Sequence, residues 1–409
     1  VQYPYVYCNW NDARNGNWHI GFARSTNGGD SFLDDVLLVD NYYSNDGDPV
    51  LQVDENGTVY CLWLSFDPYS YDGRLVLLKS YDHGATWADT SYPPVSGSGY
   101  LPDKPWFRVR GDTVYVVYAN FNTWTWYCQI KFTRSLDGGQ TFDPPISVSG
   151  SPSNVGIPFI AVDPQGYIYV IWLNSGYDRF YMAKSTNGGV SFSSPFVVQN
   201  VYFTSSSNWR AHPIPSLEAG GNDTLYLTWL DDRFGSWDVL FSRSVNGGSS
   251  WSSPIKVNDD TGYGLQNMPM LSVDPTGALH LAFYDHRTGL WDIRYARSLD
   301  KGLSFESNLR VSDVSFEGEY FMGDYMGIVT DNQYVYVTWS DGRNGNQDIY
   351  FARGEGLIGY LCGDANGDGE ISVGDLSYLG SYLYAGGPAP ISPLDPNEDG
   401  TWDTLDLLY

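Results

Sequence analysis

The sequence predicts an all-β protein in which one structural unit repeats around a ring. Six copies of an eight-residue pattern, Ser-x-Asp/Asn-x-Gly-x-Ser/Thr-Phe/Trp, begin 55, 55, 50, 59 and 54 residues apart. Between the copies lie short runs rich in aromatic and β-branched residues, and no part of this region reads as a long helix. A repeat of roughly 50 residues built from such runs is typical of a radial array of small β-sheets, that is, a β-propeller.

The eight-residue copies, called octapeptides below, predict turns. Asp or Asn and Gly tolerate left-handed backbone, and Ser and Asp oxygens hydrogen-bond to nearby N–H groups. The closing aromatic residue is expected to fill its blade. The octapeptides run from Ser25 to Phe32, Ser80 to Trp87, Ser135 to Phe142, Ser185 to Phe192, Ser244 to Trp251 and Ser298 to Phe305. They resemble the Asp box of sialidase-like β-propellers, a resemblance that implies a fold and says little of function, because the motif recurs from blade to blade.

Each repeat unit is expected to contribute four strands with turn residues between them. In the fourth unit these strands are 160–163, 167–172, 180–185 and 196–198, where alternating side chains are typical of half-buried strands. The second strand counts the units best, because it ends near an aromatic residue in each. These residues are Trp10, Trp63, Tyr118, Trp172, Trp229, Tyr284 and Trp339. The count predicts seven units against six octapeptides.

The two ends of the repeat region explain this mismatch. Residues 4–24 closely match residues 334–353, so the first unit begins at its second strand and the last stops after its third. The sequence therefore predicts seven blades, two of them incomplete. The alternative is a ring of six blades in which the two ends share one. An incomplete blade leaves an unpaired strand edge, which can pair with another chain.

Charge and composition exclude several classes of partner. The formal net charge is −26, whereas binding to nucleic acid or to an anionic membrane surface needs basic patches. No apolar run approaches the ~20 residues of a membrane span, so membrane insertion is not expected. The chain begins at Val1 and is rich in Tyr, Asn and Gly, which favours a secreted protein that is extracellular or attached to a cell surface.

Four cysteines, Cys8, Cys61, Cys128 and Cys362, are too few for a disulfide framework at this length. Cys8 and Cys61 occupy equivalent places in neighbouring repeats, which are too far apart to bridge. We expect buried free thiols, with Cys8–Cys362 as the one pairing that merits a test.

The last part of the chain is predicted to be a second domain, so that the domains are 1–355 and 356–409. The second contains nine acidic residues and no Lys or Arg, and a short Gly-rich link joins it to the repeats. Two twelve-residue loops in it place oxygen-bearing side chains at positions 1, 3, 5, 9 and 12, with Gly at position 6. This is the spacing of calcium-binding loops, and hard oxygen ligands favour calcium.

The two loops predict two bound calcium ions, with position 7 offering its backbone carbonyl. Positions 1, 3, 5, 7, 9 and 12 of the first loop are Asp364, Asn366, Asp368, Glu370, Ser372 and Asp375. Those of the second loop are Asp395, Asn397, Asp399, Thr401, Asp403 and Asp406. Between the loops, leucines recur at helical spacing, so this domain is predicted to be α-helical.

The paired loops resemble the dockerin module, which docks onto a cohesin partner, and the resemblance covers about 50 residues. The resemblance implies the metal roles given above and a protein partner for this domain. Val373-Gly374 and Thr404-Leu405 stand where cellulosomal dockerins commonly have a Ser-Thr pair. The expected partner is therefore either cohesin-like or another copy of this chain.

Whether the propeller is an enzyme depends on residues that break its symmetry. A sialidase resemblance would require three arginines around the substrate carboxylate, a Tyr nucleophile with a Glu partner and an Asp acid. The arginines here recur with the repeat, which indicates structural roles. They are Arg14, Arg233, Arg287 and Arg343 beside an Asp after the second strand, and Arg24, Arg134, Arg243, Arg297 and Arg353 at the end of the third. Phe107-Arg108-Val109 is a poor match to the Arg-Ile-Pro motif of sialidases.

Residues that do break the symmetry occur where each innermost strand begins, near the central channel. The candidates for ligand binding are Asp48, Lys104, His212, Asp324 and Tyr325, with Asp46, Asp103 and Arg210 beside them. They line the mouth of the ring, where they can bind a ligand or simply fill and hydrate it. No catalytic residue is assigned. The five histidines show no ligand spacing, which disfavours transition-metal catalysis.

The sequence thus favours a secreted, non-catalytic propeller whose calcium-loaded tail serves attachment or head-to-tail assembly into an extracellular structure, which includes filaments. One alternative is a sialidase-like glycoside hydrolase anchored through the same tail. Another is a glycan-binding propeller without catalysis, which uses surface aromatic side chains as stacking platforms.

Overall fold

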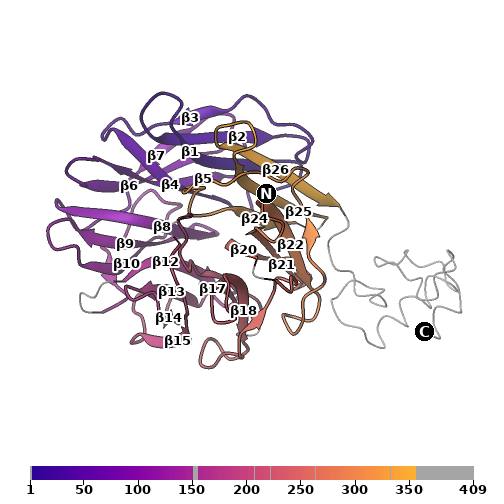
Figure 1. Cartoon of the computed structure of the whole chain (residues 1–409). Helices are drawn as coiled ribbons and strands as arrows, with labels where there is room; N and C mark the ends of the chain where they lie inside the picture. The colour runs from indigo at the N-terminus through magenta and orange to yellow at the C-terminus, as the bar shows by residue number, and fades with distance from the viewer. Residues whose placement is uncertain are drawn as a thin grey trace, which may run out of the picture.

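Seven antiparallel β-sheets, called blades 1 to 7 in chain order, form a ring in the computed structural model (Figure 1). The structure describes residues 2–355 apart from 151–154, 207, 222, 263 and 332. Blades 2 to 6 have four strands each, and blades 1 and 7 have three. The prediction of seven blades, two of them incomplete, is therefore confirmed over the alternative of six.

The strands of each blade follow one another in space as in sequence, so that neighbours are joined by short connections. Blade 1 contains β1 (Val6–Asp12), β2 (His19–Ser25) and β3 (Val36–Leu38), and blade 2 contains β4 (Asn45–Val53), β5 (Val59–Phe66), β6 (Gly73–Ser80) and β7 (Ala88–Ser91). Blade 3 contains β8 (Tyr100–Arg110), β9 (Thr113–Asn122), β10 (Cys128–Ser135) and β11 (Ile146–Ser147), and blade 4 contains β12 (Val155–Val162), β13 (Ile168–Asn174), β14 (Arg179–Ser185) and β15 (Phe196–Asn200).

The second half of the ring repeats this order. Blade 5 contains β16 (Ser216–Ala219), β17 (Leu225–Asp231), β18 (Asp238–Ser244) and β19 (Ile255–Lys256), and blade 6 contains β20 (Gln266–Val273), β21 (Leu279–Asp285), β22 (Asp292–Ser298) and β23 (Leu309–Arg310). Blade 7 contains β24 (Gly327–Thr330), β25 (Tyr334–Asp341) and β26 (Asp348–Glu355). Blade 1 thus lacks the innermost strand and blade 7 the outermost, as predicted from the matching ends of the repeats. These two blades lie side by side in Figure 1.

The octapeptides form the turns expected of them, at the end of the ring that we call the octapeptide end. In the first, Ser25 Oγ donates to Asn27 Oδ1 over 2.7 Å and accepts from Gly29 N over 2.9 Å. The same two bonds recur in the third, at Ser135, Asp137 and Gly139. The predicted hydrogen bonding of the Ser and Asp side chains is confirmed.

These turns also join each blade to the one before it. A Cβ added to Gly29 would lie 2.6 Å from the Phe351 ring of blade 7, and one on Gly84 would lie 2.7 Å from Phe22 of blade 1. The glycine is therefore required both for left-handed backbone and for close approach to the neighbouring third strand. The closing aromatic packs nearby, since the Phe32 and Phe351 ring centroids are 4.9 Å apart.

The recurring arginines are structural, as expected. Those at the end of a third strand reach the octapeptide of the next blade: Arg353 donates to Gly28 O over 2.8 Å, and Arg24 to His83 O over 3.1 Å. Those in the hairpin after the second strand clamp a buried carboxylate; Arg233 Nε donates to Asp231 Oδ1 over 2.7 Å. Because these groups are satisfied within the scaffold, they are not available to hold a substrate carboxylate.

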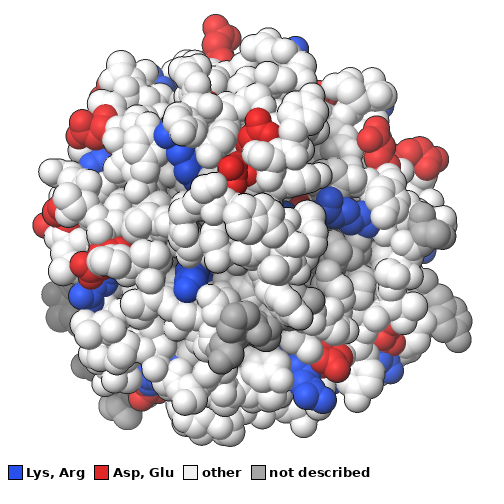
Figure 2. Space-filling model, turned by 90° about the vertical axis from the view of Figure 1, so that its left-hand side faces the viewer, with Lys and Arg blue, Asp and Glu red and all other residues white. Residues whose placement is uncertain are grey.

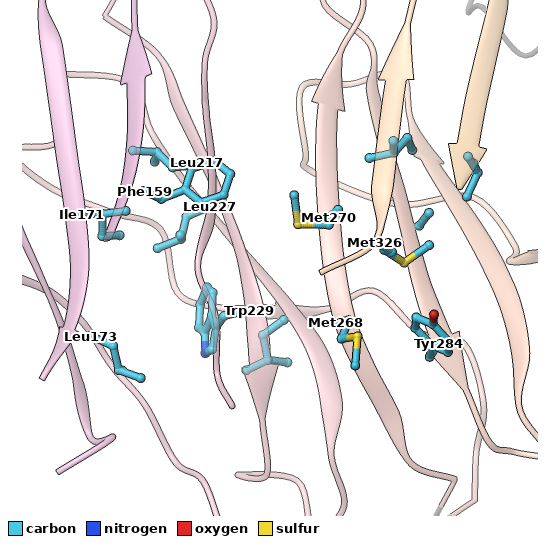
Figure 3. Close-up of a cluster of buried hydrophobic side chains, with 14 of the residues drawn as sticks. Phe159, Ile171, Leu173, Leu217, Leu227, Trp229, Met268, Met270, Tyr284 and Met326 are labelled. Carbon is cyan, nitrogen blue, oxygen red and sulfur yellow. The ribbon is translucent and has the colours of Figure 1, made fainter. Parts of the chain in front are cut away.

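Buried side chains join the blades into nearly continuous cores. One cluster runs through blades 4 to 7, and three others join blades 3 to 4, 2 to 3 and 1 to 2. Figure 3 shows Phe159, Leu217 and Leu227 pointing toward one another within the largest cluster. Among the described residues no buried cluster joins blade 7 to blade 1.

Cys8, Cys61 and Cys128 are buried free thiols, and burial raises the pKa of Cys8 and of Cys61 to about 12. Cys362, and with it the predicted Cys8–Cys362 pairing, lies outside the described residues. So do the predicted second domain, its helix and both calcium loops. Within the part that is described, no helix is long and apolar enough to cross a bilayer.

Candidate ligand-binding site

The candidate residues from the sequence gather at the end of the ring opposite the octapeptides. We call this the hairpin end, because the second-to-third strand hairpins lie there and the innermost strands begin there. Asp48, Lys104, Ile157 and Met268 each have positive φ, between 49° and 53°, where the innermost strand shifts register against its neighbour. Each precedes a proline, which has no N–H and so loses no ladder bond at such a bulge.

Lys104 lies at the centre of the charged cluster. Its Nζ is 3.0 Å from Asp48 Oδ2 of blade 2 and 2.7 Å from Asp324 Oδ2, which precedes blade 7. The Lys104 side chain is 12% exposed and that of Asp324 is 7% exposed. One ammonium group therefore pairs with two carboxylates and ties blade 3 to the opposite side of the channel.

Arg210 and His212 reach the same cluster from the segment before blade 5. Arg210 Nη2 lies 3.2 Å from Asp324, its guanidinium stacks 4.5 Å from the Phe321 ring, and its side chain is 37% exposed. His212 stacks on Tyr177 with ring centroids 5.5 Å apart, and its buried Nδ1 has no hydrogen-bond partner among the described residues. Burial lowers the pKa of His212, so the ring is neutral near pH 7.

Tyr325 completes the group, so the structure brings all five predicted candidates to one place. Its ring lies 5.6 Å from Lys104 Nζ and 5.4 Å from Trp106. Burial raises the pKa of Tyr325 well above its usual value, so the phenol keeps its proton. The buried Nε1 of Trp106 has no hydrogen-bond partner in the part of the chain that is described. Trp106 was not among the predicted residues.

The structure also adds an ion pair that the sequence did not reveal. Arg108 Nη2 lies 2.6 Å from Glu218 Oε1, which joins blade 3 to blade 5 across the channel. Burial raises the pKa of Glu218, although Arg108 opposes the shift. The available signal was the presence of a charged residue, Arg108 or Glu218, on an innermost strand.

Asp46 and Asp103 have different roles from those of the charged cluster. Asp46 is fully buried within blade 2, where its Oδ1 accepts a hydrogen bond from Trp63 Nε1 over 2.9 Å. It is therefore a structural residue. Asp103 lies next to Lys104, and burial together with the charges of Asp48 and Asp324 raises its pKa to about 6, against the opposing effect of Lys104.

The pKa shifts of Asp324 and Tyr325 indicate the charge state of each side chain near pH 7. The positive charges of Lys104 and Arg210 outweigh burial and lower the pKa of Asp324, which therefore cannot donate a proton near pH 7. Tyr325 keeps its proton and has no carboxylate hydrogen-bonded to it in the described structure. A retaining glycosidase needs one protonated and one nucleophilic group facing each other. In the described structure, Asp324 and Tyr325 are not hydrogen-bonded to each other.

Exposed aromatic side chains surround the cluster on the same end of the ring. Tyr69 is 92% exposed, Trp124 is 80% and Trp126 is 57%. They stand in the hairpins of blades 2 and 3, which touch where the rings of Tyr71 and Trp126 meet with centroids 5.8 Å apart. Other exposed aromatics in hairpins are Trp18, Tyr127, Tyr177 and Phe234. In the octapeptides, by contrast, Tyr81 is the one aromatic residue that is exposed.

The charged side chains on one side of the outer rim are scattered. Figure 2 shows the rim on the side of blades 2 and 3, where Lys and Arg lie singly, most of them near an Asp or Glu. No large patch of positive charge forms on this face. Across the described residues, no group of three or more His, Cys, Asp or Glu side chains is arranged to hold a metal ion.

Comparison with known proteins adds the fold class. No family model matches the chain, and no curated protein matches it. Among solved structures, a Hadza microbial sialidase is similar over 82% of this chain and 73% of its own, at 15% identity and a TM-score of 0.50. An α-L-arabinanase from Penicillium chrysogenum is similar over 75% and 92%, at 14% identity and a TM-score of 0.51.

The likeness is one of fold. A polysaccharide lyase that acts as an ulvan lyase is also similar, over 76% of this chain and 82% of its own, at 13% identity and a TM-score of 0.51. These propeller neighbours are glycoside hydrolases or lyases. The structural similarity shows the seven-bladed, sialidase-like architecture. At identities this low it does not carry a catalytic residue over to this chain.

Proposed function

We propose that this chain is an extracellular, non-catalytic propeller that binds carbohydrate on its hairpin end. The observation that carries the proposal is the gathering of exposed aromatic rings there, with Tyr69, Trp124 and Trp126 foremost. Exposed apolar side chains that gather on one face mark binding surfaces. Flat rings with a polar edge suit sugars, which present C–H groups on one face and hydroxyl groups around the rim.

The charged cluster supports the same proposal by supplying polar partners. Arg210 is the more exposed of its two cations, with a side chain 37% exposed, and is the group that can reach a sugar hydroxyl directly. Sites for small ligands combine aromatic walls with a few polar groups that converge in this way. A chain of sugar units would run along the hairpins of blades 2 and 3 and place one unit at the channel mouth.

The charge states of the cluster support binding without catalysis. Asp324 is held ionised by Lys104 and Arg210, and Tyr325 is held neutral by burial, so neither is ready for acid or nucleophilic catalysis. Asp103, with a pKa of about 6, is the residue on which a hydrolytic alternative would rest.

The tail, residues 356–409, would attach the propeller to its surroundings. We propose two calcium ions in its loops and a protein partner, either cohesin-like or another copy of the chain. Assembly into larger structures is a second candidate function. It is favoured by one observation: in the described structure β1 and β26 are sheet edges, whereas the equivalent second and third strands of blades 2 to 6 pair on both sides.

Binding is tested by glycan arrays, followed by calorimetry with the best ligand and the full chain. Tyr69→Ala and Trp124→Ala are each expected to weaken binding at least tenfold. Tyr81→Ala is the matched control, since Tyr81 is 57% exposed but lies on the octapeptide end. Equal loss in all three variants, or none, would contradict the proposed surface. A panel of fluorogenic glycosides tests the alternative: turnover that Asp103→Asn abolishes would establish an enzyme.

Assembly is tested separately by light scattering of the full chain with calcium and with excess chelator. Large particles that form with calcium and dissolve without it would support the tail as a connector between copies. An unchanged monomer under both conditions would exclude self-assembly and leave attachment to a different protein.

A further inference from the structure

Blade 7 has an unpaired outer edge with a groove beside it. In blades 1 to 6 a fourth, outermost strand follows the third, whereas among the described residues β26 pairs only with β25. Between blades 7 and 1 lies a groove of about 750 Å³. Its apolar lining includes Trp10, Phe32, Leu33, Ile349 and Phe351. Leu33 is 48% exposed and Ile349 39%, so apolar surface is left open where the other blades have a covering strand.

We propose that residues 357–362 form the outermost strand of blade 7 and cover this groove. The sequence after β26 reads Gly356-Leu357-Ile358-Gly359-Tyr360-Leu361-Cys362, a glycine followed by a short apolar run. Gly356 directly after β26 favours a tight turn, and the apolar residues need a surface on which to pack. A strand added to an open edge gains main-chain hydrogen bonds, and its alternate side chains enter the pocket beside it.

Proximity favours this segment over any other occupant. It begins two residues after the end of β26, so it is present at the edge at an effective concentration on the order of millimolar. A second copy of the chain or a foreign peptide would have to compete with it. The short connection also replaces the octapeptide that blades 1 to 6 place between their third and fourth strands.

The side chains of β26 that face the groove determine how the proposed strand would pair with β26. Ile349 and Phe351 line the groove, and Arg353 on the same face donates to Gly28 O of blade 1. In an antiparallel pair, residues opposite each other share a face of the sheet. A turn of two or four residues places the odd-numbered residues of one strand opposite the even-numbered residues of the other. Ile358, Tyr360 and Cys362 would therefore face the groove, with Cys362 opposite Ile349 or Phe351.

With this strand in place, the boundary between the propeller and the tail domain differs from the one expected from the sequence. The propeller would extend to about residue 362, and the tail domain would start immediately before its first calcium loop. We call the interface between two neighbouring blades a seam. The seam between blades 7 and 1 would then gain apolar contacts of the kind that the other seams already have. The inference is independent of the carbohydrate proposal, because the groove and the aromatic hairpins of blades 2 and 3 are different surfaces.

Disulfide trapping with the native Cys362 tests the register in the full chain. In a Cys8→Ala background, Ile349→Cys and Phe351→Cys are made separately and exposed to a mild oxidant. At least one is expected to form an intramolecular disulfide with Cys362 in most chains, as read by mass spectrometry. Tyr350→Cys is the matched control: it is tethered equally closely but lies on the opposite face of β26, where Tyr350 stacks on Trp339. It is expected to form none.

Three results would overturn the proposal. The first is the absence of a Cys362 disulfide in both groove-face variants, and the second is equal trapping in all three. The third is a disulfide between two chains, which would assign the edge to a second copy. As an independent measurement, Tyr360→Pro is expected to lower the Tm by several degrees, whereas the same substitution of Ser392, far along the tail, is expected to leave it unchanged.

Discussion

Two seams of the same ring are held together differently. Blades 4 to 7 share one buried cluster, in which Trp229 is fully buried and packs with Phe180 and its neighbours. Between blades 7 and 1 the described structure has a groove instead, and the equivalent Trp10 lines it half-buried. What remains at that seam is the contact of blade 7 with the octapeptide of blade 1, in which Arg353 pairs with Asp30 and donates to Gly28 O and the Phe351 ring meets that of Phe32. The ring is therefore closed by directional bonds and a few aromatic contacts where elsewhere it is closed by apolar burial.

The largest expected effect comes from the equivalent tryptophans themselves. Trp229→Ala removes a fully buried indole from the shared core and is expected to lower the free energy of unfolding by about 3–5 kcal/mol. Trp10→Ala removes a half-buried one beside a groove and is expected to cost about 1 kcal/mol. Urea unfolding measures both. Similar losses for the two variants would mean that the seams do not differ in packing.

The channel ion pairs provide the second test. Lys104→Met leaves Asp48 and Asp324 buried without their shared cation, so the free energy of unfolding is expected to fall by about 3 kcal/mol. Asp324 keeps its ion pair with Arg210, so adding Asp48→Asn to that variant removes the carboxylate that is left without a cation and should restore part of the loss. If Lys104→Met alone costs nothing, the link from blade 3 to the last blade does not stabilise the ring.

A pH dependence of stability follows from Asp103. Its folded pKa of about 6 lies above the ordinary value of 3.8, so the folded protein binds this proton more tightly than the unfolded chain does. Between about pH 4 and pH 6 this residue therefore lowers stability as the pH rises. Asp103→Asn is expected to gain on the order of 2 kcal/mol over the native chain between pH 4 and pH 7. Unfolding curves at each pH measure this, and a constant difference would contradict it.

The smallest expected effect compares one bond at two seams. Arg353→Ala and Arg243→Ala each remove a donor to the octapeptide carbonyl of the next blade, Gly28 O at 2.8 Å and Lys301 O at 2.9 Å. Each is expected to cost about 1 kcal/mol. Only Arg353→Ala should speed hydrogen exchange in β1, because blades 5 and 6 also share a buried cluster. Faster exchange in both places would show that the apolar core adds no local protection.

The repeat made the architecture predictable. The octapeptide spacing, the second-strand aromatics and the match between 4–24 and 334–353 each depend on local sequence, and together they specified seven blades with incomplete ends. The structural roles of the recurring arginines followed from the same symmetry. A residue that recurs in several blades holds a contact that also recurs in those blades.

The candidate site was only partly predictable. The five candidate residues were found because they interrupt the symmetry, but their pairing was not. Lys104 and Asp324 are 220 positions apart and meet only because the ring closes. Arg108 and Glu218 were missed for the same reason. The aromatic hairpins were visible as Tyr69, Trp124 and Trp126, yet their exposure depends on which loops the ring leaves uncovered.

The proline-linked bulges of the innermost strands have an evolutionary consequence. At Asp48, Lys104, Ile157 and Met268 the backbone takes the same left-handed turn whatever the side chain, and these side chains are an acid, a base, a branched alkyl group and a thioether. A single codon change at such a position alters what the blade presents at the channel and leaves the blade itself intact. Duplication of a blade also duplicates its proline-linked bulge. New specificity in rings of this kind can therefore arise one blade at a time, with no need for a new loop.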